Sequence, residues 1–416
     1  MKKILKLYME TNLVIRIVIG LVIGAGIGLL LPAWSIIGVF GDIFVNALKA
    51  VAPVLVFVLV ISSLANAGAG IGKKFRTVII LYMLSTLLAA FVAVIGSELF
   101  PVTLSLTQAA VENTAPEGIG EVLHTLVLNM VANPIKAIGE ANYIGVLTWA
   151  VIFGLALKQI AGDNTKAVLQ NVSDAVTKAV HWVINLAPFG IMGLVFTSVS
   201  ENGMGIFTDY GKLLLLLVGC MLVVALIVDP FIAWICLREN PYPLVLKCFK
   251  ESGLTAFFTR SSAANIPINM ALCEKLGLDR DVYSVSIPLG ATINMDGAAI
   301  TITVMTLAAA NTIGIHVDIP TALFLSVIAA LGACGSSGVA GGSLLLIPMA
   351  CSLFNISSDV AMQVVGIGFI IGVVQDSFET AINSSGDVLF AATAEYMEWK
   401  KEGRKIPLKK DKTGRS

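Results

Sequence analysis

Long uninterrupted apolar stretches constrain the fold of this 416-residue chain more than any other feature. A helix that crosses a membrane needs about 20 consecutive, mostly apolar residues. Hydrophobic residues make up 57% of the chain and charged residues 13%, about half the share that soluble chains carry. Six stretches are long enough to cross, at about 13–34, 40–63, 77–100, 142–161, 179–199 and 212–237. We therefore predict an all-α polytopic membrane protein.

Other classes of protein are disfavoured by charge and by cysteine and histidine usage. The 27 basic and 27 acidic residues cancel, which argues against a nucleic-acid-binding protein. The six cysteines show no CxxC spacing, and the three histidines lie far apart. Zinc-site and disulfide patterns are therefore lacking, and we expect no cofactor.

The distribution of lysine and arginine predicts the orientation of the chain. Basic residues gather around the first stretch, between the second and third, between the fourth and fifth, and after the sixth. Eight more lie between Lys400 and Arg415. The positive-inside rule therefore places both termini in the cytoplasm. Two cytoplasmic ends require an even number of crossings, so residues 244–399 are expected to add two to the first six.

The last third holds four further apolar regions, and two of them carry small polar residues at their centres. The regions are about 244–276, 282–310, 319–352 and 357–393, and the polar runs lie at 259–267 and 335–343. Open backbone at membrane depth persists only where protein or a watery cavity covers it. We expect two re-entrant helical hairpins in addition to eight transmembrane helices. The order hairpin, span, hairpin, span in this last third forms an inverted repeat. Such repeats with broken helices are typical of secondary transporters.

Four acidic residues lie in the two spans that alternate with these hairpins. They are Asp296, Asp376, Glu379 and Asp387. Each charge at the membrane centre costs about 2.5–3.5 kcal/mol on insertion scales. Arg260 is the only basic residue set among the small polar residues of this region, and it cannot neutralise all four. Protonation is one remedy, and a bound hard cation such as sodium is the other.

The spacing of polar residues places them on shared surfaces. Asp376, Thr380, Asn383 and Asp387 fall within a stripe of about 60° on one helix, with Glu379 beside it. In the preceding span, the run 294–297 (Asn-Met-Asp-Gly) interrupts an apolar helix, and its glycine permits the backbone to unwind. A polar seam that only joins helices is the alternative interpretation. Three acids on one helix are costly for that purpose.

These residues resemble the dicarboxylate/amino acid:cation symporters, the family that contains the glutamate transporters. The chain is most similar to the bacterial sodium:serine/threonine symporters, with the matching motifs concentrated in 257–390. The resemblance implies a homotrimer in the bacterial cytoplasmic membrane. In that family a transport domain, here 241–399 with the third span, moves like a lift against a scaffold from 1–240. A basic cytoplasmic tail, 400–416, would follow.

The resemblance also implies ligands for sodium and for an amino acid. The first sodium site would use Asn294, Asn383, Asp387 and the carbonyl of Gly290; the second Thr292, Met295, Ala333, Cys334 and Ser336; the third Asn294 and Asp296 with Tyr82, Ser85 and Thr86. The amino acid would bind Asp376 through its ammonium group and Asn383 through its α-carboxylate, with Thr380 and the hairpin tips at Arg260, Ser261, Ser262 and Val339. Backbone amides at such tips suit a carboxylate.

Glu379 departs from the members of the family that carry acidic amino acids, which place an arginine there. A carboxylate at this position would repel an acidic side chain and could accept a hydrogen bond from a hydroxyl. We therefore expect a neutral substrate, and the resemblance implies serine or threonine. Arg260 is expected either to pair with Asp376 or Glu379 in the empty site or to contact the substrate.

Several alternatives remain open on the sequence. They are proton coupling, a dicarboxylate carrier of the same fold, and an intramembrane aspartyl protease built on Asp296 and Asp387. The protease alternative leaves both hairpins unexplained, and we assign no catalytic residue. The sixth stretch contains Asp229 followed by Pro230, for which a kink near the membrane interface is favoured over a functional acid.

Overall fold

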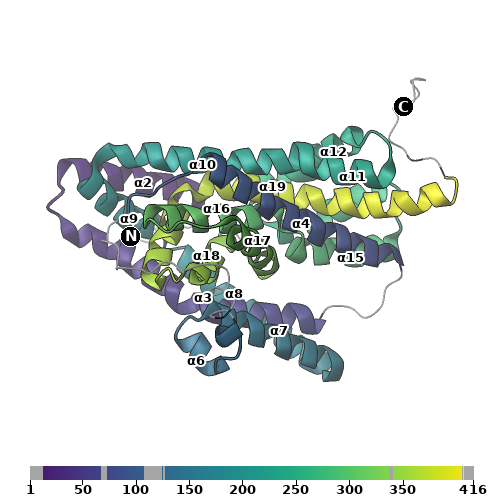
Figure 1. The fold of residues 1–416 in the computed structure, drawn as a ribbon, viewed down its shortest axis with the longest axis horizontal. Coiled ribbons are helices and arrows are strands. Elements are labelled where there is room, and N and C mark those ends of the chain that lie inside the picture. Colours follow the sequence, from purple (N-terminus) through teal and green to yellow (C-terminus); the bar gives the residue numbers. More distant parts are fainter. Residues whose placement is uncertain are drawn as a thin grey trace, which may run out of the picture.

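The computed structural model describes residues 13–66, 73–106, 124, 127–336, 341–404 and 406, and all regular structure in these residues is helical (Figure 1). The first half contains α2 (Leu13–Leu30), η1 (Ser35–Ile37), α3 (Gly38–Asn66), α4 (Lys73–Leu99), α6 (Pro134–Gly139), α7 (Tyr143–Ile160), α8 (Asp163–Ile184), α9 (Ala187–Asn202), η2 (Gly203–Gly205), α10 (Ile206–Val223), η3 (Val224–Val228) and α11 (Asp229–Leu237). The second half contains α12 (Tyr242–Cys248), η4 (Phe249–Gly253), α13 (Leu254–Thr259), α14 (Ser262–Lys275), α15 (Arg280–Ile293), α16 (Asp296–Thr312), α17 (Ile319–Ala333), η5 (Ser343–Leu346), α18 (Ile347–Cys351), η6 (Ser352–Phe354) and α19 (Ser358–Lys401).

The lengths and apolar composition of these helices support a polytopic membrane protein. Among the described residues, six helical runs are long and apolar enough to cross a membrane, and a seventh results if α8 and α9 form one bent span. The helix at the first expected span, α2, is shorter. Residues 1–12 and 407–416, on which the expected cytoplasmic position of both termini depends, lie outside the described residues.

The fifth stretch is not the single helix that we expected over 179–199. It is divided between α8 and α9, which meet at an angle of 48°. Pro188 has no N–H group to donate to the carbonyl of Ile184, and α8 ends at Ile184. The helix therefore stops there, and the chain resumes in a new direction.

The two polar interruptions predicted from the sequence are both present. The α13 helix ends at Thr259, Arg260 adopts a left-handed conformation with φ of 50°, and α14 begins at Ser262. The hydroxyl of Ser261 caps α14 by accepting a hydrogen bond from the amide of Ala264. The α14 helix returns along η4 and α13, so the segment 242–275 forms a helical hairpin.

The second interruption separates α17 from the short helices η5 and α18. The α17 helix ends at Ala333 and the chain becomes helical again at Ser343, while 337–340 lie outside the described residues. A third break divides the expected seventh span. There α15 ends at Ile293 and α16 begins at Asp296, and Asn294 and Met295 between them are not helical.

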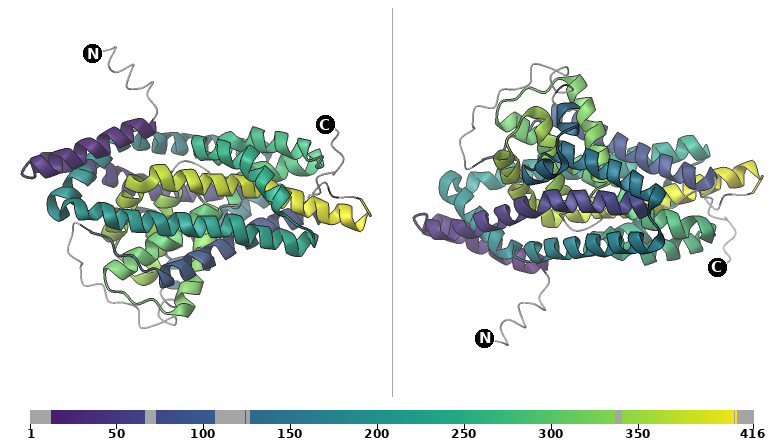
Figure 2. Two further views of the ribbon diagram at one scale, coloured as in Figure 1. Left: turned by 90° about the horizontal axis from the view of Figure 1, so that it is seen from above. Right: turned by 90° about the horizontal axis from the view of Figure 1, so that it is seen from below.

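The helices pack in two groups. The first group contains α2, α3, α7, α8 and α9, which contact one another extensively. The second group contains α4 and the helices from α10 to α19, and the 44-residue α19 contacts most of its members. Figure 2 shows α19 running between the helices of this second group.

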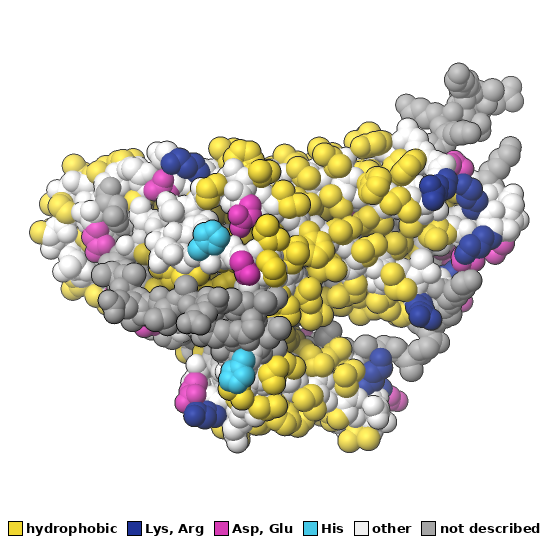
Figure 3. Space-filling view, viewed as in Figure 1, with side chains coloured by type: hydrophobic (Ala, Val, Ile, Leu, Met, Phe, Trp, Pro, Cys, Tyr) yellow, Lys and Arg dark blue, Asp and Glu magenta, His cyan; other side chains and the backbone are white. Residues whose placement is uncertain are grey.

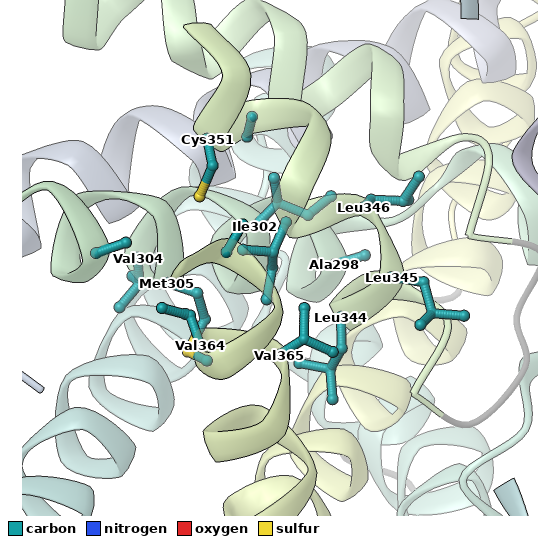
Figure 4. Packing of buried hydrophobic residues seen from close by; sticks show 14 of the residues in the cluster. Ala298, Ile302, Val304, Met305, Leu344, Leu345, Leu346, Cys351, Val364 and Val365 are labelled. Atoms are coloured by element: carbon teal, nitrogen blue, oxygen red, sulfur yellow. The ribbon is translucent and has the colours of Figure 1, made fainter. Parts of the chain in front are cut away.

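The core of the second group is tightly packed hydrocarbon. Ile302 and Met305 of α16 lie against Leu344 of η5 and against Val364 and Val365 of α19 (Figure 4). Figure 3 shows a broad apolar surface over the middle of the molecule, with most of the visible lysine and arginine side chains toward one end. Leu215 on α10 and Ile95 on α4 are among the exposed apolar side chains. Such a surface suits contact with lipid.

Candidate functional site

The break between α15 and α16 lies against the middle of α19. Asn294, at the end of α15, donates from Nδ2 to the carbonyl of Asn383 at 3.0 Å and to Oδ1 of Asp387 at 3.1 Å. The amide of Gly297, at the start of α16, donates to Oδ1 of Asn383 at 2.8 Å. The unwound backbone is thus fastened to the polar stripe of α19, as the glycine and the asparagines predicted.

The residues expected for the first sodium site come together here. A Cβ atom at Gly290 would lie only 2.7 Å from Oδ1 of Asp387, so this close approach requires glycine. The hydroxyl of Tyr82 donates to the backbone carbonyl of Asp387 at 2.9 Å and holds α4 against α19. Oδ1 of Asn294 is buried without a hydrogen-bond partner. Carboxylate, amide and carbonyl oxygens are therefore concentrated where a hard cation could bind.

Three of the residues expected for the third sodium site, Asp296, Ser85 and Thr86, also meet. The hydroxyl of Ser85 donates to Oδ2 of Asp296 at 2.8 Å, and that of Thr86 donates to Oδ1 at 2.9 Å. Thr86 in turn accepts a hydrogen bond from the amide of Met295 at 3.1 Å. The third expected span therefore contributes polar side chains to a buried carboxylate. From the sequence, the patch at 82–86 was only mildly polar.

Asp229 was interpreted from the sequence as part of a kink near the membrane interface. In the structure its carboxylate is 3% exposed, and its Oδ1 lies 2.7 Å from the hydroxyl of Ser85. Ser85 thus stands between two buried acids, Asp229 and Asp296. The energetic cost of placing an acid in an apolar span was a sequence signal that Asp229 has a functional role. The proline that follows it made a helix kink the simpler interpretation.

The residues expected for the second sodium site are brought together only in part. The Cys334 thiol lies 3.7 Å from the carbonyl of Ile293, next to the unwound segment that contains Met295. Ala333 and Ser336 lie at the end of α17 and share a backbone hydrogen bond. The hydroxyl of Thr292 donates to the carbonyl of Leu289 in its own helix, at 2.7 Å.

Residues from both polar helix interruptions reach Asp376 on α19. Nη1 of Arg260, from the first hairpin, lies 3.8 Å from Oδ2 of Asp376, and the amide of Gly341, before η5, donates to Oδ1 at 3.4 Å. Arg260 therefore pairs with Asp376, which was one of the two pairings expected for an empty site. Ser262 is buried in the first turn of α14, while Val339 lies outside the described residues.

A small cavity adjoins this meeting point. Its volume is about 30 Å³, which is room for one or two water molecules. Its polar lining comes from Arg260, Gly341, Gln375 and Asp376, and helices α2, α8 and α9 supply apolar lining. This volume is too small for an amino acid.

Glu379 faces away from this cavity, toward α16 and η5. Its Oε2 accepts hydrogen bonds from Thr301 at 2.7 Å, from Ser343 at 2.9 Å and from Gln375. These three donors were not recognised in the sequence, since each is an ordinary polar residue by itself. The hydroxyl of Thr380 donates to the carbonyl of Asp376 in its own helix, at 2.8 Å.

Comparison with known proteins agrees with this geometry. Residues 13–397 match the model of the sodium:dicarboxylate symporter family. The chain is 63% identical to the serine/threonine transporter SstT of Bifidobacterium adolescentis over 96% of its own length and 93% of that protein. It is 61% identical to SstT of Streptococcus agalactiae serotype Ia, over 95% and 98% of the two chains, and 56% identical to SstT of Streptococcus thermophilus, over 96% and 100%. The chain therefore belongs to the sodium:dicarboxylate symporter family.

Proposed function

We propose that this protein imports serine and threonine together with sodium across the bacterial cytoplasmic membrane. The observation that carries the proposal is the buried carboxylate of Asp376, which contacts Arg260 and Gly341 of the two expected hairpins and lies on the same stripe of α19 as Asp387. A carboxylate at this position can bind the ammonium group of an amino acid. The relatives that cover nearly the whole chain are named serine/threonine transporters, which supports the same substrates.

The contacts at the site support particular roles for its residues. Gly297 binds Oδ1 of Asn383, so Nδ2 of Asn383 is left as a donor for an α-carboxylate, and it now lies 3.4 Å from the sulfur of Met295. Amides of the first turn of α14 that its own helix does not use would add donors of the same kind. Sodium would bind among the oxygens of Asp387, Asn294 and Asp296. The intramembrane protease alternative is set aside, because the chain belongs to a family of symporters.

The proposed architecture is eight transmembrane helices with two re-entrant hairpins, both termini in the cytoplasm, and an elevator-type movement within a homotrimer. The packing supports a scaffold of α2, α3, α7, α8 and α9 and a moving group built around α19. It also supports placing α10 and α11 with the moving group, in addition to α4, because these helices pack against α19. The cavity at Asp376 lies where the two groups touch.

The experiment that tests the function is uptake of radiolabelled serine into proteoliposomes. We expect uptake against a concentration gradient when sodium is present outside, and none when potassium replaces it at the same pH. Threonine should compete with labelled serine, and aspartate should not. Uptake driven equally well by a pH gradient without sodium would favour proton coupling, and preferential uptake of aspartate would favour a dicarboxylate carrier.

Replacing Glu379 by arginine is expected to abolish serine uptake. Three hydrogen-bond donors surround Oε2 of Glu379, and a guanidinium group has only donors to offer them. The three donors would have to turn to accept from it, and desolvating a guanidinium group in a buried site costs several kcal/mol. We expect uptake to fall by about 100-fold or more, and aspartate to compete relatively better than in the parent protein.

Glu379→Gln is the matched control for this prediction. Glutamine keeps one oxygen as an acceptor and removes the charge without adding a cation. We expect it to retain much more serine uptake than Glu379→Arg. Undiminished serine uptake in the arginine variant would show that Glu379 does not determine which substrate is carried.

A further inference from the structure

The hydroxyl of Ser85 lies between the carboxylates of Asp229 and Asp296 and can donate a hydrogen bond to only one of them. Its Oγ lies 2.7 Å from Oδ1 of Asp229 and 2.8 Å from Oδ2 of Asp296. A serine hydroxyl carries a single hydrogen and can donate it to only one of the two carboxylates at a time. Both acids and Ser85 are buried, so water does not supply a second donor. The hydrogen therefore has two alternative acceptors.

A second observation beside these acids points to a cation. Oδ1 of Asn294 is buried and has no hydrogen-bond partner, and buried polar atoms of this kind are rare. Asn294 and Asp296 both lie at the break between α15 and α16, and Gly386 of α19 is close to both: a Cβ atom there would lie 2.7 Å from Nδ2 of Asn294 and 3.8 Å from Oδ2 of Asp296. An unpaired amide oxygen and a carboxylate at one helix break are the kinds of ligand that a hard ion prefers.

A sodium ion at this place would change the direction of the Ser85 hydroxyl. A cation binds the lone pairs of a hydroxyl oxygen, so the hydrogen of Ser85 cannot remain directed at the carboxylate that shares the ion. Asp229 provides another acceptor at 2.7 Å. Rotation about one bond would then keep the hydroxyl hydrogen-bonded both with and without the ion.

We propose that Asp229 is a positioning residue of the third sodium site, which accepts the hydrogen of Ser85 when sodium binds and so turns the Ser85 oxygen into a ligand. The inference rests on the proposed sodium symport. Asp229 is not among the ligands that the family resemblance implies. Its position on α11 has a local cause, since it directly follows the π-helical turn Val224–Val228.

The segment around Asp229 is held firmly enough for such a role. Pro230 cannot donate to the carbonyl of Leu226, which is the acceptor four residues earlier. The hydroxyl of Tyr242, from α12, donates to that carbonyl at 2.9 Å. The helix therefore continues past the proline, with the Asp229 side chain directed at α4.

The test is the sodium concentration that gives half-maximal serine uptake in proteoliposomes. We expect Asp229→Leu to raise this concentration about tenfold and Asp229→Asn to raise it less, because asparagine keeps an acceptor oxygen. Ser85→Ala should raise it to a similar extent. The double variant Asp229→Leu/Ser85→Ala should have the same half-saturating sodium concentration as Ser85→Ala alone, since Asp229 acts through Ser85. The KM for serine at saturating sodium should change less than twofold in each case.

Ser97→Ala is the matched control, since Ser97 is another buried hydroxyl on α4. It should leave the sodium dependence unchanged. Two results would overturn the inference and leave sodium symport intact. One is an unchanged half-saturating sodium concentration in both Asp229 variants. The other is a double variant in which the effects of Asp229→Leu and Ser85→Ala multiply. If serine uptake by the parent protein does not depend on sodium, the proposed function is wrong, and this inference is wrong with it.

Discussion

Replacement of Asp376 by alanine is expected to abolish serine binding. Asp376 is the buried acid that meets both hairpins, and the variant removes the proposed partner of the substrate ammonium group. Hydrogen bonds to charged groups contribute about 1.5–3 kcal/mol, and breaking a buried ion pair costs about 3–5 kcal/mol. The variant incurs the first loss directly and also leaves Arg260 without its carboxylate. We expect at least a 100-fold loss of serine affinity, measured by calorimetry in detergent with saturating sodium.

The matched control for this prediction is Ser377→Ala. Ser377 is the next residue of α19, is also buried, and its hydroxyl donates only to the carbonyl of Val373 in its own helix. Serine affinity should stay within about threefold of the parent value in this control. If Asp376→Ala binds serine as tightly as Ser377→Ala does, the substrate ammonium group binds elsewhere and the site must be placed differently.

The helix breaks are the part of the fold that the sequence predicted best. Small polar residues interrupt apolar stretches at 259–267, 294–297 and 335–343, and the helices end or begin in each of these runs. The reason is local, since glycine, serine and proline within a few residues weaken a helix wherever it packs. The family resemblance implied that Asn294 and Asp387 share a site, and the structure places the two in contact.

Contacts between distant residues that the family resemblance did not supply were not predicted. Thr301, Ser343 and Gln375 surround Glu379 from three segments, and nothing in their own surroundings distinguishes them from other polar residues. Asp229 was assigned to a kink because its partner, Ser85, is 144 residues earlier in the chain. A sequence pattern indicates that an acid is buried at an energetic cost. The tertiary packing determines which side chain donates a hydrogen bond to that acid.

Replacement of Asp387 by asparagine is expected to weaken the dependence of transport on sodium. The variant is nearly identical in shape but loses the negative charge that faces Asn294 and Gly290. Its new amide group would also oppose Nδ2 of Asn269, which lies 3.5 Å from Oδ2 of Asp387. We expect the half-saturating sodium concentration for serine uptake to rise at least tenfold, which corresponds to about 1.4 kcal/mol. Ser385→Ala, whose hydroxyl bonds only within α19, should leave it unchanged.

A loss of sodium binding can be distinguished from a loss of stability by measuring thermal unfolding. A ligand that binds only the folded state stabilises it by about 2.7 kcal/mol at 100 times its Kd, so sodium should raise the unfolding temperature of the parent protein. Asp387→Asn should lose most of this increase. Without sodium it should be no less stable than the parent, because an uncompensated carboxylate in a membrane interior is itself costly. A variant that unfolds earlier without sodium but keeps the full sodium-induced increase would assign Asp387 to the packing of α15 against α19 rather than to the ion.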